Sequence, residues 1–326
     1  MTIVARAPLR VSLAGGGSDL PAFFEHEEGT VVSMAINLYV YVILNTRPMT
    51  KTYRVAYSRV EEVDDLDNLG HDLARACLRR FDAPPGVEIA TIADVPAGTG
   101  LGSSSAFTSA LLAALNAERY RPPYATPREL AEAACAVEIG DCGRATGKQD
   151  AYACAVGGIN RFRFRPDGTV DGTPLESERD VIFDLRNNMF LLYTGVSRDA
   201  SKVLAQTDMA DSRERATMRA QANLAGLLWD NLTRGGGSSV GEVLNASWAL
   251  KRGLRGVTND QFDSWHRTIC EVGGKSAGAK LCGAGGGGCF AVYAPREHHK
   301  AIVAATGLQP LWFRLDWEGV RTTLLG

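Results

Sequence analysis

The segment from Pro96 to Ser105 contains the residue types that bind phosphate. Three glycines are spaced two apart, and three serines follow directly. Glycine has no Cβ, so its backbone can adopt positive φ and approach a ligand closely. The apolar stretch 106–118 predicts a helix that begins within the serines. The first N–H groups of such a helix have no internal partner and lie at the positive end of its dipole. The pattern predicts a phosphate site, with a serine-capped glycine turn as the alternative. The predicted phosphate-binding residues are Pro96, Gly98, Thr99, Gly100, Leu101, Gly102, Ser103, Ser104 and Ser105.

Other phosphate-binding motifs do not fit the chain. Gly274-Lys275-Ser276 has the tail of a Walker loop, but the first glycine of that motif would fall at Ile269. The glycines at 283–288 match the letters of a dinucleotide fingerprint, but a strand rather than a helix is predicted to follow them. The HRD and DFG motifs of eukaryotic-type kinases are absent from the sequence.

The elements around the glycine-serine segment are predicted from local signals. Residues 87–95 are predicted to form a strand that leads into it. Thr126 and Glu129 have capping-box spacing, which predicts a helix that runs to about Ile139. A second glycine-bearing loop, 140–150, follows that helix.

Strands and helices alternate irregularly along the rest of the chain. Strands are predicted at 3–14 (broken at Pro8), 30–46, 53–59, 159–165, 181–185, 189–194, 289–294 and 311–317, and helices at 67–82, over most of 199–273 and at 296–306. Without strict βαβ alternation, the fold class is predicted to be α+β rather than a doubly wound sheet. A boundary near Asn187 divides the chain into predicted domains 1–186 and 187–326.

The composition is that of a globular protein. The 326 residues are 45% hydrophobic and 22% charged, and the net charge is −2. Without a basic excess, nucleic acid is not expected as a partner. No apolar run reaches the ~18 residues of a membrane span, and the N-terminus lacks the pattern of a signal peptide. Seven scattered cysteines without a CxxC pair do not predict zinc, and they suit reduced thiols in the cytoplasm.

Three motifs resemble those of the GHMP kinase superfamily, which includes galactokinase, homoserine kinase and mevalonate kinase. The stretch 96–106, PAGTGLGSSSA, resembles the PxxxGLGSS motif, while 7–19 and 280–288 resemble the N-terminal and C-terminal motifs in matching order. Four stretches also resemble the D-glycero-D-manno-heptose 7-phosphate kinases and, less closely, the kinase half of bacterial fucokinases. They are RVSLAGGGSDLPAFF (10–24), GKQDAYACAVGG (147–158), YTGVSRDAS (193–201) and GAGGGGC (283–289).

The resemblance implies a two-domain GHMP kinase fold and a set of catalytic groups. The expected N-terminal domain is like ribosomal protein S5 domain 2, and the C-terminal domain is ferredoxin-like. ATP and Mg²⁺ are the implied cofactors, with Ser104 and Glu138 as metal ligands, because a hydroxyl and a carboxylate suit Mg²⁺. Asp150 is the implied acid–base residue and Arg10 the cation beside it. The structural alternatives are a solvent-facing helix charge for Glu138, an Asx-type cap for Asp150 and a surface side chain for Arg10.

The resemblance also implies how substrate is bound. Asp19 matches a sugar-binding aspartate, but the Glu-His pair that precedes it in galactokinase is replaced here by Gly16-Gly17. This departure argues against galactose and leaves room for a larger sugar. Arg198 is hypothesised to contact a 7-phosphate, with a structural salt bridge as the alternative. The expected substrate residues are Gly16, Gly17, Ser18, Asp19, Gly147, Lys148, Arg198, Gly285 and Gly286. The alternatives are a solvent-facing side chain for Lys148 and a tight turn between two strands for the glycines at 283–288.

The implied activity is ATP-dependent phosphorylation of the anomeric hydroxyl of a heptose 7-phosphate to the 1,7-bisphosphate. Two alternatives stay open: a kinase of another sugar such as fucose, and a non-catalytic sugar or nucleotide sensor on the same fold. The expected partner is a small sugar or sugar phosphate, and the expected location is the cytoplasm. The chain is expected to be a monomer or a homodimer. The sugar epimer, the anomer and the adenine-pocket residues are not predicted.

Overall fold

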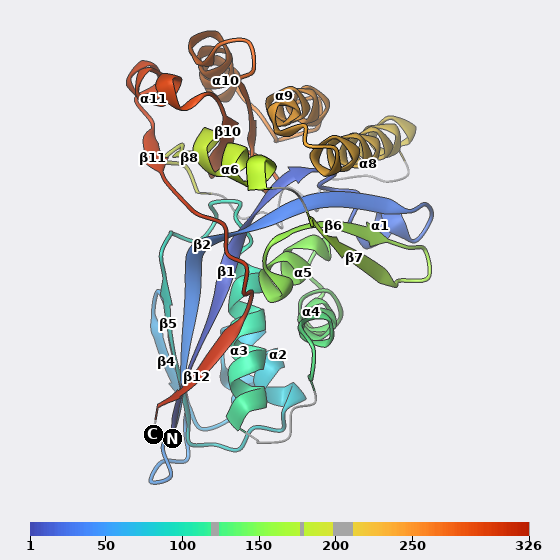
Figure 1. Ribbon diagram of the computed structural model, residues 1–326. Coiled ribbons are helices and arrows are strands. Elements are labelled where there is room, and N and C mark those ends of the chain that lie inside the picture. Colours follow the sequence, from blue (N-terminus) through green and yellow to red (C-terminus); the bar gives the residue numbers. More distant parts are fainter. Residues whose placement is uncertain (119–123, 177–178, 198–210, 326) are drawn as a thin grey trace.

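A long antiparallel strand pair runs through the protein. In the computed structural model, which describes residues 1–118, 124–176, 179–197 and 211–325, β1 (Thr2–Ala14) and β2 (Gly29–Thr46) pair along most of their length (Figure 1). The predicted break at Pro8 is wrong, because β1 continues through it. The register shifts between Pro8 and Leu9, and such a bulge accommodates a residue that has no N–H to donate.

The larger sheet is built outward from this pair. Its order is β12-β1-β2-β5-β3-β4, and β6 pairs with the other half of β2 and carries β7. The added strands are β3 (Tyr53–Ala56), β4 (Val60–Val63), β5 (Val87–Ala93), β6 (Ile159–Phe164), β7 (Val170–Pro174) and β12 (Arg321–Leu325).

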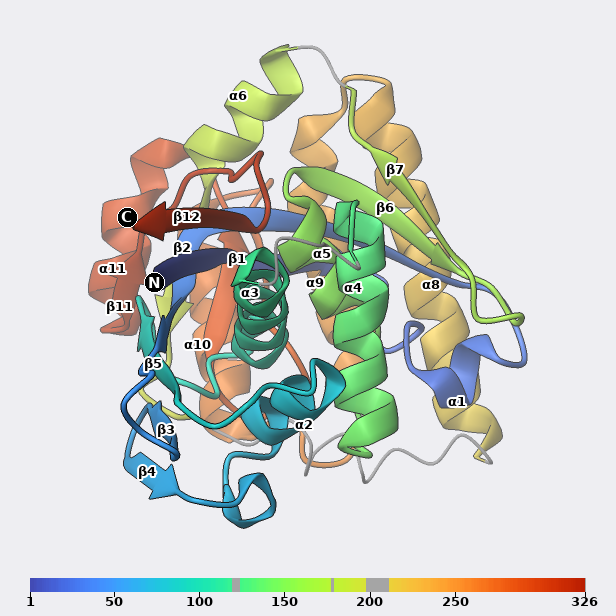
Figure 2. The same ribbon diagram turned by 90° about the horizontal axis from the view of Figure 1, so that it is seen from below.

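Helices cover one face of this sheet (Figures 1 and 2). The central one is α3 (Ser103–Glu118), in which every residue from Ser105 to Leu115 is buried. A helix that is apolar on all sides belongs inside a core, and α3 packs against β1 and β2. Around it lie α2 (Asp72–Arg80), α4 (Pro127–Cys135) and α5 (Gln149–Val156), while the short α1 (Pro21–Phe24) follows the first glycine turn.

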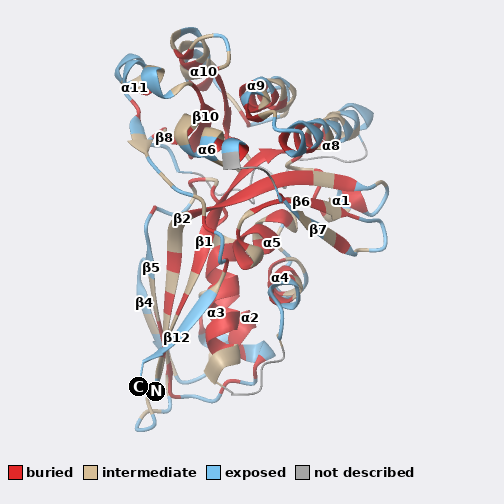
Figure 3. Cartoon of the chain, in the orientation of Figure 1, coloured by how far each residue is buried: buried red, intermediate tan, exposed pale blue. Residues whose placement is uncertain are grey.

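A second, four-stranded antiparallel sheet follows in the chain, with the order β11-β8-β10-β9. Its strands are β8 (Met189–Tyr193), β9 (Gly278–Leu281), β10 (Cys289–Tyr293) and β11 (Gln309–Leu311). The helices of this part are α6 (Arg179–Asn188), α8 (Ser212–Thr233), α9 (Val240–Lys251), α10 (Asp260–Gly273) and α11 (His299–Thr306). It has its own core, which includes Phe190, Trp248 and Phe290, and Figure 3 shows buried residues in both parts.

Several predicted elements differ from the structure, and one of them is the predicted strand 311–317, because β11 ends at Leu311. Residues 181–185 lie in α6 rather than in a strand, and the buried Val181 and Leu185 have the i, i+4 spacing of one helix face. The final strand is β12, which was not predicted because all five of its residues are exposed and show no apolar alternation. β12 returns to pair with β1, so a division at residues 186 and 187 does not fully separate the two sheets.

The predicted fold class is confirmed: the chain has mixed α and β content in a two-sheet arrangement. None of the helices in the described parts of the chain is long and apolar enough to cross a membrane.

Candidate active site

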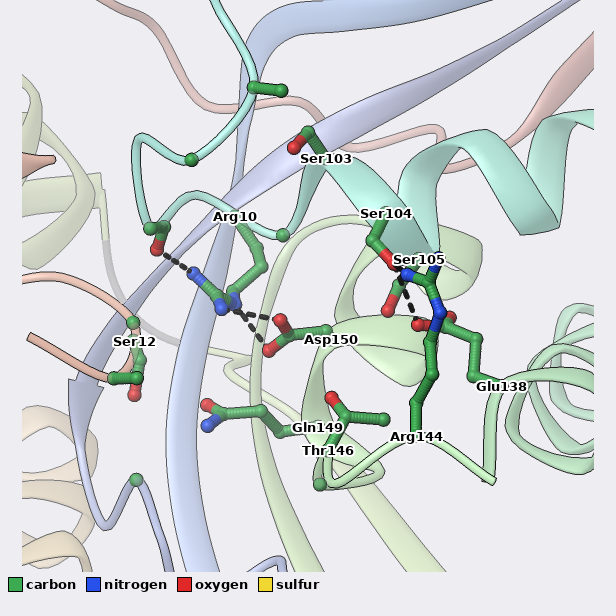
Figure 4. Close-up of a pocket in the computed structure, with 18 of the residues that line it drawn as sticks. Arg10, Ser12, Ser103, Ser104, Ser105, Glu138, Arg144, Thr146, Gln149 and Asp150 are labelled. Carbon is green, nitrogen blue, oxygen red and sulfur yellow. Dashed lines mark hydrogen bonds and ion pairs between the residues drawn. The ribbon is translucent and has the colours of Figure 1, made fainter. Parts of the chain in front are cut away.

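A cavity of about 930 Å³ lies where the glycine-serine segment meets both parts of the chain. β1 and the start of α5 contribute Arg10 and Asp150, and the second part contributes Lys251 and Lys280. The close-up in Figure 4 shows the acidic, basic and hydroxyl groups of the first part directed toward one another.

Backbone hydrogen bonds from both parts of the chain hold the glycine loop in place. The Arg10 amide donates to the Leu101 carbonyl at 2.9 Å, and the Cys289 amide donates to the Thr99 carbonyl at 3.0 Å. Gly100 has φ +76°, and a Cβ there would lie 2.6 Å from the Cys282 carbonyl oxygen, so only glycine fits this position. Seven of the nine predicted loop residues line the cavity, whereas Thr99 and Leu101 are buried supports.

The Arg10 side chain connects the loop to the predicted catalytic acid. Its Nε donates to Asp150 Oδ1 at 2.6 Å and its Nη2 to Asp150 Oδ2 at 2.5 Å, which is the strong bidentate arrangement. Its third contact, from Nη1, is to the Gly100 carbonyl at 2.6 Å. Burial by itself lowers the pKa of Arg10, but the Asp150 carboxylate outweighs it and the net shift is upward. The arginine is therefore a fixed cation on a rigid strand.

A second pair joins the start of α3 to the end of α4. Ser104 Oγ donates to Glu138 Oε2 at 3.0 Å, and Arg144 Nη1 donates to Ser104 Oγ at 3.1 Å. Glu138 lies in a π-helical turn, Ala136–Asp141, that continues α4 beyond its capping box at Thr126. Such turns occur often at functional sites because they redirect one side chain without ending the helix.

Glu138 is only 2% exposed, and burial is the main reason why its pKa is raised to about 7. Hydrogen bonds from Ser105 and Ser104 lower the pKa, while the charge of Asp150 raises it further. Its Oε1 is buried and has no hydrogen-bond partner among the described residues. A buried carboxylate oxygen without a partner, beside a serine hydroxyl, fits a divalent cation with oxygen ligands. The pair Ser104 and Glu138 is thus suited to Mg²⁺.

Asp19 is placed at the same cavity by α5. Its Oδ1 accepts from the Gly17 amide at 2.9 Å, and its Oδ2 accepts from the Gln149 amide at 3.1 Å. Burial, followed by the charge of Asp150, raises the pKa of Asp19. A Cβ on Gly147 would lie 1.8 Å from Asp19 Oδ2, so glycine is required there to let the carboxylate approach the helix. Gly16 and Gly17 line the cavity beside it.

Several predicted substrate residues are placed away from the cavity. Lys148 does not line it, because its ammonium donates to the Gly168 carbonyl at 2.7 Å and lies 3.6 Å from Glu132. Ser18 is buried, and its hydroxyl donates to the Gly15 carbonyl. Gly285 and Gly286 also lie outside the cavity lining and pack on Val257, whose carbonyl accepts from the Gly286 amide. Arg198 lies outside the described residues.

Other cavity residues were not predicted from the sequence. Arg144 and Gln149 lie beside predicted residues in the 140–150 loop, so proximity in sequence was the available signal. Lys280 interrupts a strand that is otherwise small and apolar, which is a signal for a functional lysine. Lys251, at the last turn of α9, has no local signal.

One end of the cavity is lined by rings and aliphatic side chains. The centroid of the His71 ring lies 4.6 Å from that of Tyr57 and 4.8 Å from that of Phe107. Burial lowers the pKa of His71, which favours a neutral ring, and its Nδ1 accepts from the Ala74 amide at the start of α2. Val40, Leu73 and Val95 complete this wall. These rings and aliphatic side chains give the cavity an apolar surface.

A glycine cradle that faces an arginine-paired carboxylate across one cavity is suited to transferring a phosphoryl group. Phosphoryl transfer needs positioning and charge neutralisation more than covalent participation by the protein, and this cavity supplies both. The class of protein is therefore a phosphotransferase.

Comparisons with known proteins show which proteins the chain is similar to. Residues 68–158 match the GHMP kinases N terminal domain, a span that contains the glycine loop, Glu138 and Asp150. The chain is 28% identical to D-glycero-alpha-D-manno-heptose 7-phosphate kinase of Campylobacter jejuni over 318 residues, which cover 93% of both chains.

Solved structures show the same fold. A D-glycero-D-manno-heptose 1-phosphate kinase from Bacteroides thetaiotaomicron superposes with a TM-score of 0.79 and 24% identity over 99% of both chains. A galactokinase from Lactococcus lactis superposes with a TM-score of 0.74 and 17% identity over 99% of this chain and 95% of that one. Residues 68–158 are therefore a GHMP kinase N-terminal domain, in a chain whose relatives and structural neighbours are GHMP kinases, which are phosphotransferases that act on hydroxyl groups.

Proposed function

We propose that the protein transfers the γ-phosphoryl group of ATP to the anomeric hydroxyl of D-glycero-D-manno-heptose 7-phosphate and forms the 1,7-bisphosphate. The general activity, phosphorylation of a sugar hydroxyl, follows from the family. The choice of acceptor is supported by the relative from Campylobacter jejuni, which matches this chain over nearly its full length. The observation that carries the mechanism is the Arg10 guanidinium, which contacts both the phosphate cradle and the catalytic carboxylate.

The nucleotide half of the site follows from the cavity walls. The triphosphate lies along the backbone of residues 98–105 at the start of α3, where exposed amides and the helix dipole favour negative charge. The adenine ring lies against the wall formed by Tyr57, His71 and Phe107, which offers stacking surface.

Ser104 and Glu138 hold the metal in this proposal. When bound, Mg²⁺ neutralises charge on the phosphates of the nucleotide. Arg144 holds the Ser104 hydroxyl in place, and it is itself fixed by bonds to both oxygens of Asp72, at 2.8 and 2.9 Å for its Nη2. The oxygen ligands are thereby oriented before the nucleotide binds.

The transfer step uses Asp150 and Arg10. Asp150 accepts a hydrogen bond from the anomeric hydroxyl and aligns its oxygen with the γ-phosphorus. As the new oxygen–phosphorus bond forms, the bond from the γ-phosphorus to the β–γ bridging oxygen breaks and ADP leaves. The hydroxyl proton passes to Asp150. Arg10 keeps the carboxylate in position and stabilises negative charge that develops on the attacking oxygen.

Asp19 recognises the sugar. Its carboxylate is anchored by two backbone amides and by the Gln149 side chain, and Oδ2, which accepts one hydrogen bond, retains a lone pair that can accept a sugar hydroxyl. Gly16 and Gly17 line the adjacent wall, where the Met218 side chain packs against Gly17. We place this enzyme in the cytoplasm, which suits its seven free cysteines.

The test is an assay of ADP release over a panel of acceptors. The panel contains the heptose 7-phosphate, the heptose 1-phosphate, unphosphorylated heptose, fucose and galactose. We expect kcat/KM to be highest for the 7-phosphate, with a product phosphorylated at C1 by NMR. Higher turnover of fucose would reassign the substrate, and ATP binding without turnover of any sugar would indicate a sensor.

The Asp150→Asn variant tests the catalytic role. We expect kcat to fall by roughly 10² to 10⁴-fold, because the amide cannot take the proton, while the Kd for ATP is unchanged. Retained kcat would remove Asp150 from the mechanism.

A further inference from the structure

Two lysines, the buried Lys280 and the half-buried Lys251, line the cavity from the second part of the chain. Lys280 is on β9 and only 3% exposed, and Lys251 ends α9. Lys280 Nζ donates to the Leu13 carbonyl at 3.3 Å and to Ser247 Oγ at 3.4 Å. Lys251 Nζ donates to the Leu281 carbonyl at 3.4 Å and to the Gly283 carbonyl. All four of these acceptors are neutral.

Two of the cavity carboxylates, Asp19 and Asp150, are engaged by other groups. Both oxygens of Asp150 bind Arg10, and Asp19 is held by the Gly17 and Gln149 amides. The two ammonium groups thus share one cavity, and the acceptors of their own hydrogen bonds are all neutral. An uncompensated buried charge is costly, and proteins keep such groups where a ligand completes them.

The electrostatics of the lysines agree with this geometry. Burial, followed by the charge of Lys280, lowers the pKa of Lys251 to about 7. Burial likewise lowers the pKa of Lys280 to about 8. Arg10 contributes to both shifts, and Asp19 opposes the shift of Lys251. A dianion bound between the two ammonium groups would offset the free-energy cost of burying their positive charges.

The neighbours of the lysines indicate which dianion it is. Lys280 contacts the carbonyl of Leu13 on β1, a few residues before the Gly16-Gly17 wall and Asp19. Ser247, the hydroxyl next to Lys280, is fixed by Gln221, which also lines the cavity. The nucleotide phosphates already have the amide cradle, the α3 N-terminus and Arg10. The lysines therefore lie with the groups assigned to the acceptor sugar.

We propose that Lys251 and Lys280 form a second anion site, which binds the phosphate that the acceptor sugar already carries. This inference rests on the proposed function and specifies its substrate class: a sugar whose far end is a phosphate monoester. The lysines then set specificity, because an unphosphorylated sugar would leave both ammonium groups without an anion.

The test compares Lys280→Met and Lys251→Met with the wild type on the heptose 7-phosphate and on unphosphorylated heptose. Methionine keeps the length of the side chain and removes its charge. We expect the KM for the 7-phosphate to rise by roughly 10 to 100-fold in each variant, the size of a lost charged hydrogen bond. The KM for ATP and the KM for unphosphorylated heptose should change less than about threefold. The exposed Lys275, five residues before Lys280, supplies the control Lys275→Met, which should match the wild type.

The outcomes separate this inference from the proposed function. If the wild type phosphorylates no heptose phosphate, the proposed function fails. If it does, and both lysine variants keep the wild-type preference for the phosphorylated sugar, the inference fails alone. A rise in the KM for ATP in place of the sugar phosphate would assign the lysines to the nucleotide and also overturn the inference. Lys280→Arg restores the charge and should recover part of the preference, which a merely structural role would not produce.

Discussion

Replacing Glu138 by glutamine tests whether burial raises the pKa of this residue, which is one of the two proposed metal ligands. The pKa of Glu138 is raised from 4.5 to about 7, mainly by burial, at a residue that is 2% exposed. The difference corresponds to roughly 3 kcal/mol between the protonation states. The folded state therefore binds more protons than the unfolded state between pH 4.5 and about 7. The contribution of this group to the free energy of unfolding therefore falls as the pH rises through that window.

Glutamine keeps the shape of the side chain and cannot titrate. The stability of Glu138→Gln relative to the wild type should therefore rise by about 3 kcal/mol between pH 4.5 and pH 8 in the absence of metal and nucleotide. The measurement is urea unfolding at several pH values, with the difference between the two proteins taken at each pH so that other titrating groups cancel. The variant should also lose most kinase activity, because an amide is a poorer ligand for Mg²⁺ than a carboxylate.

The control for this experiment is Glu242→Gln, at an exposed glutamate in the first turn of α9. Its stability relative to the wild type should stay nearly constant over the same range. A difference for Glu138→Gln that does not vary with pH, or that varies equally in the control, would refute the reasoning that burial raises this pKa.

Two further substitutions test the positioning of the catalytic groups. Gly147→Ala should raise the KM for the sugar at least ~10-fold and leave the KM for ATP unchanged, because the new Cβ would displace the Asp19 carboxylate; an unchanged sugar KM would show that Asp19 does not bind the acceptor. Arg10→Lys should lower kcat by roughly 10 to 100-fold, since lysine keeps the charge but cannot hold both Asp150 oxygens and the Gly100 carbonyl together. If steady-state kinetics give Arg10→Lys the same kcat as the wild type, then only the charge of Arg10 matters and its bidentate contact does not.

The elements with strong local signals were predicted well. The capping box at Thr126 and Glu129 is present, and the helix after the serines begins at Ser103 as expected. The prediction of a strand at 181–185 is wrong, because a short apolar run does not distinguish a strand from a helix face. β12 was missed because an exposed edge strand needs no apolar alternation, and only its pairing with β1 defines it.

Within the site, the resemblance named the groups but could not say what they touch. Lys148 matched a motif, yet its length allows it to turn to Gly168 instead of the cavity. Gly285 and Gly286 were predicted to meet substrate, but they pack on Val257. In both cases the neighbour that decides the role comes from a distant part of the chain.

By itself, the sequence determined the phosphate cradle of this protein. Glycine backbone freedom, serine hydroxyls and the start of a helix are properties of adjacent residues, so they act wherever the segment is placed. The resemblance implied that Arg10 lies beside Asp150, 140 residues away, but only the tertiary structure decided that their contact is bidentate and that Lys251 and Lys280 share one cavity with them. Such encounters depend on how β1, α5, α9 and β9 pack together, and no local pattern encodes the distance between side chains on separate elements.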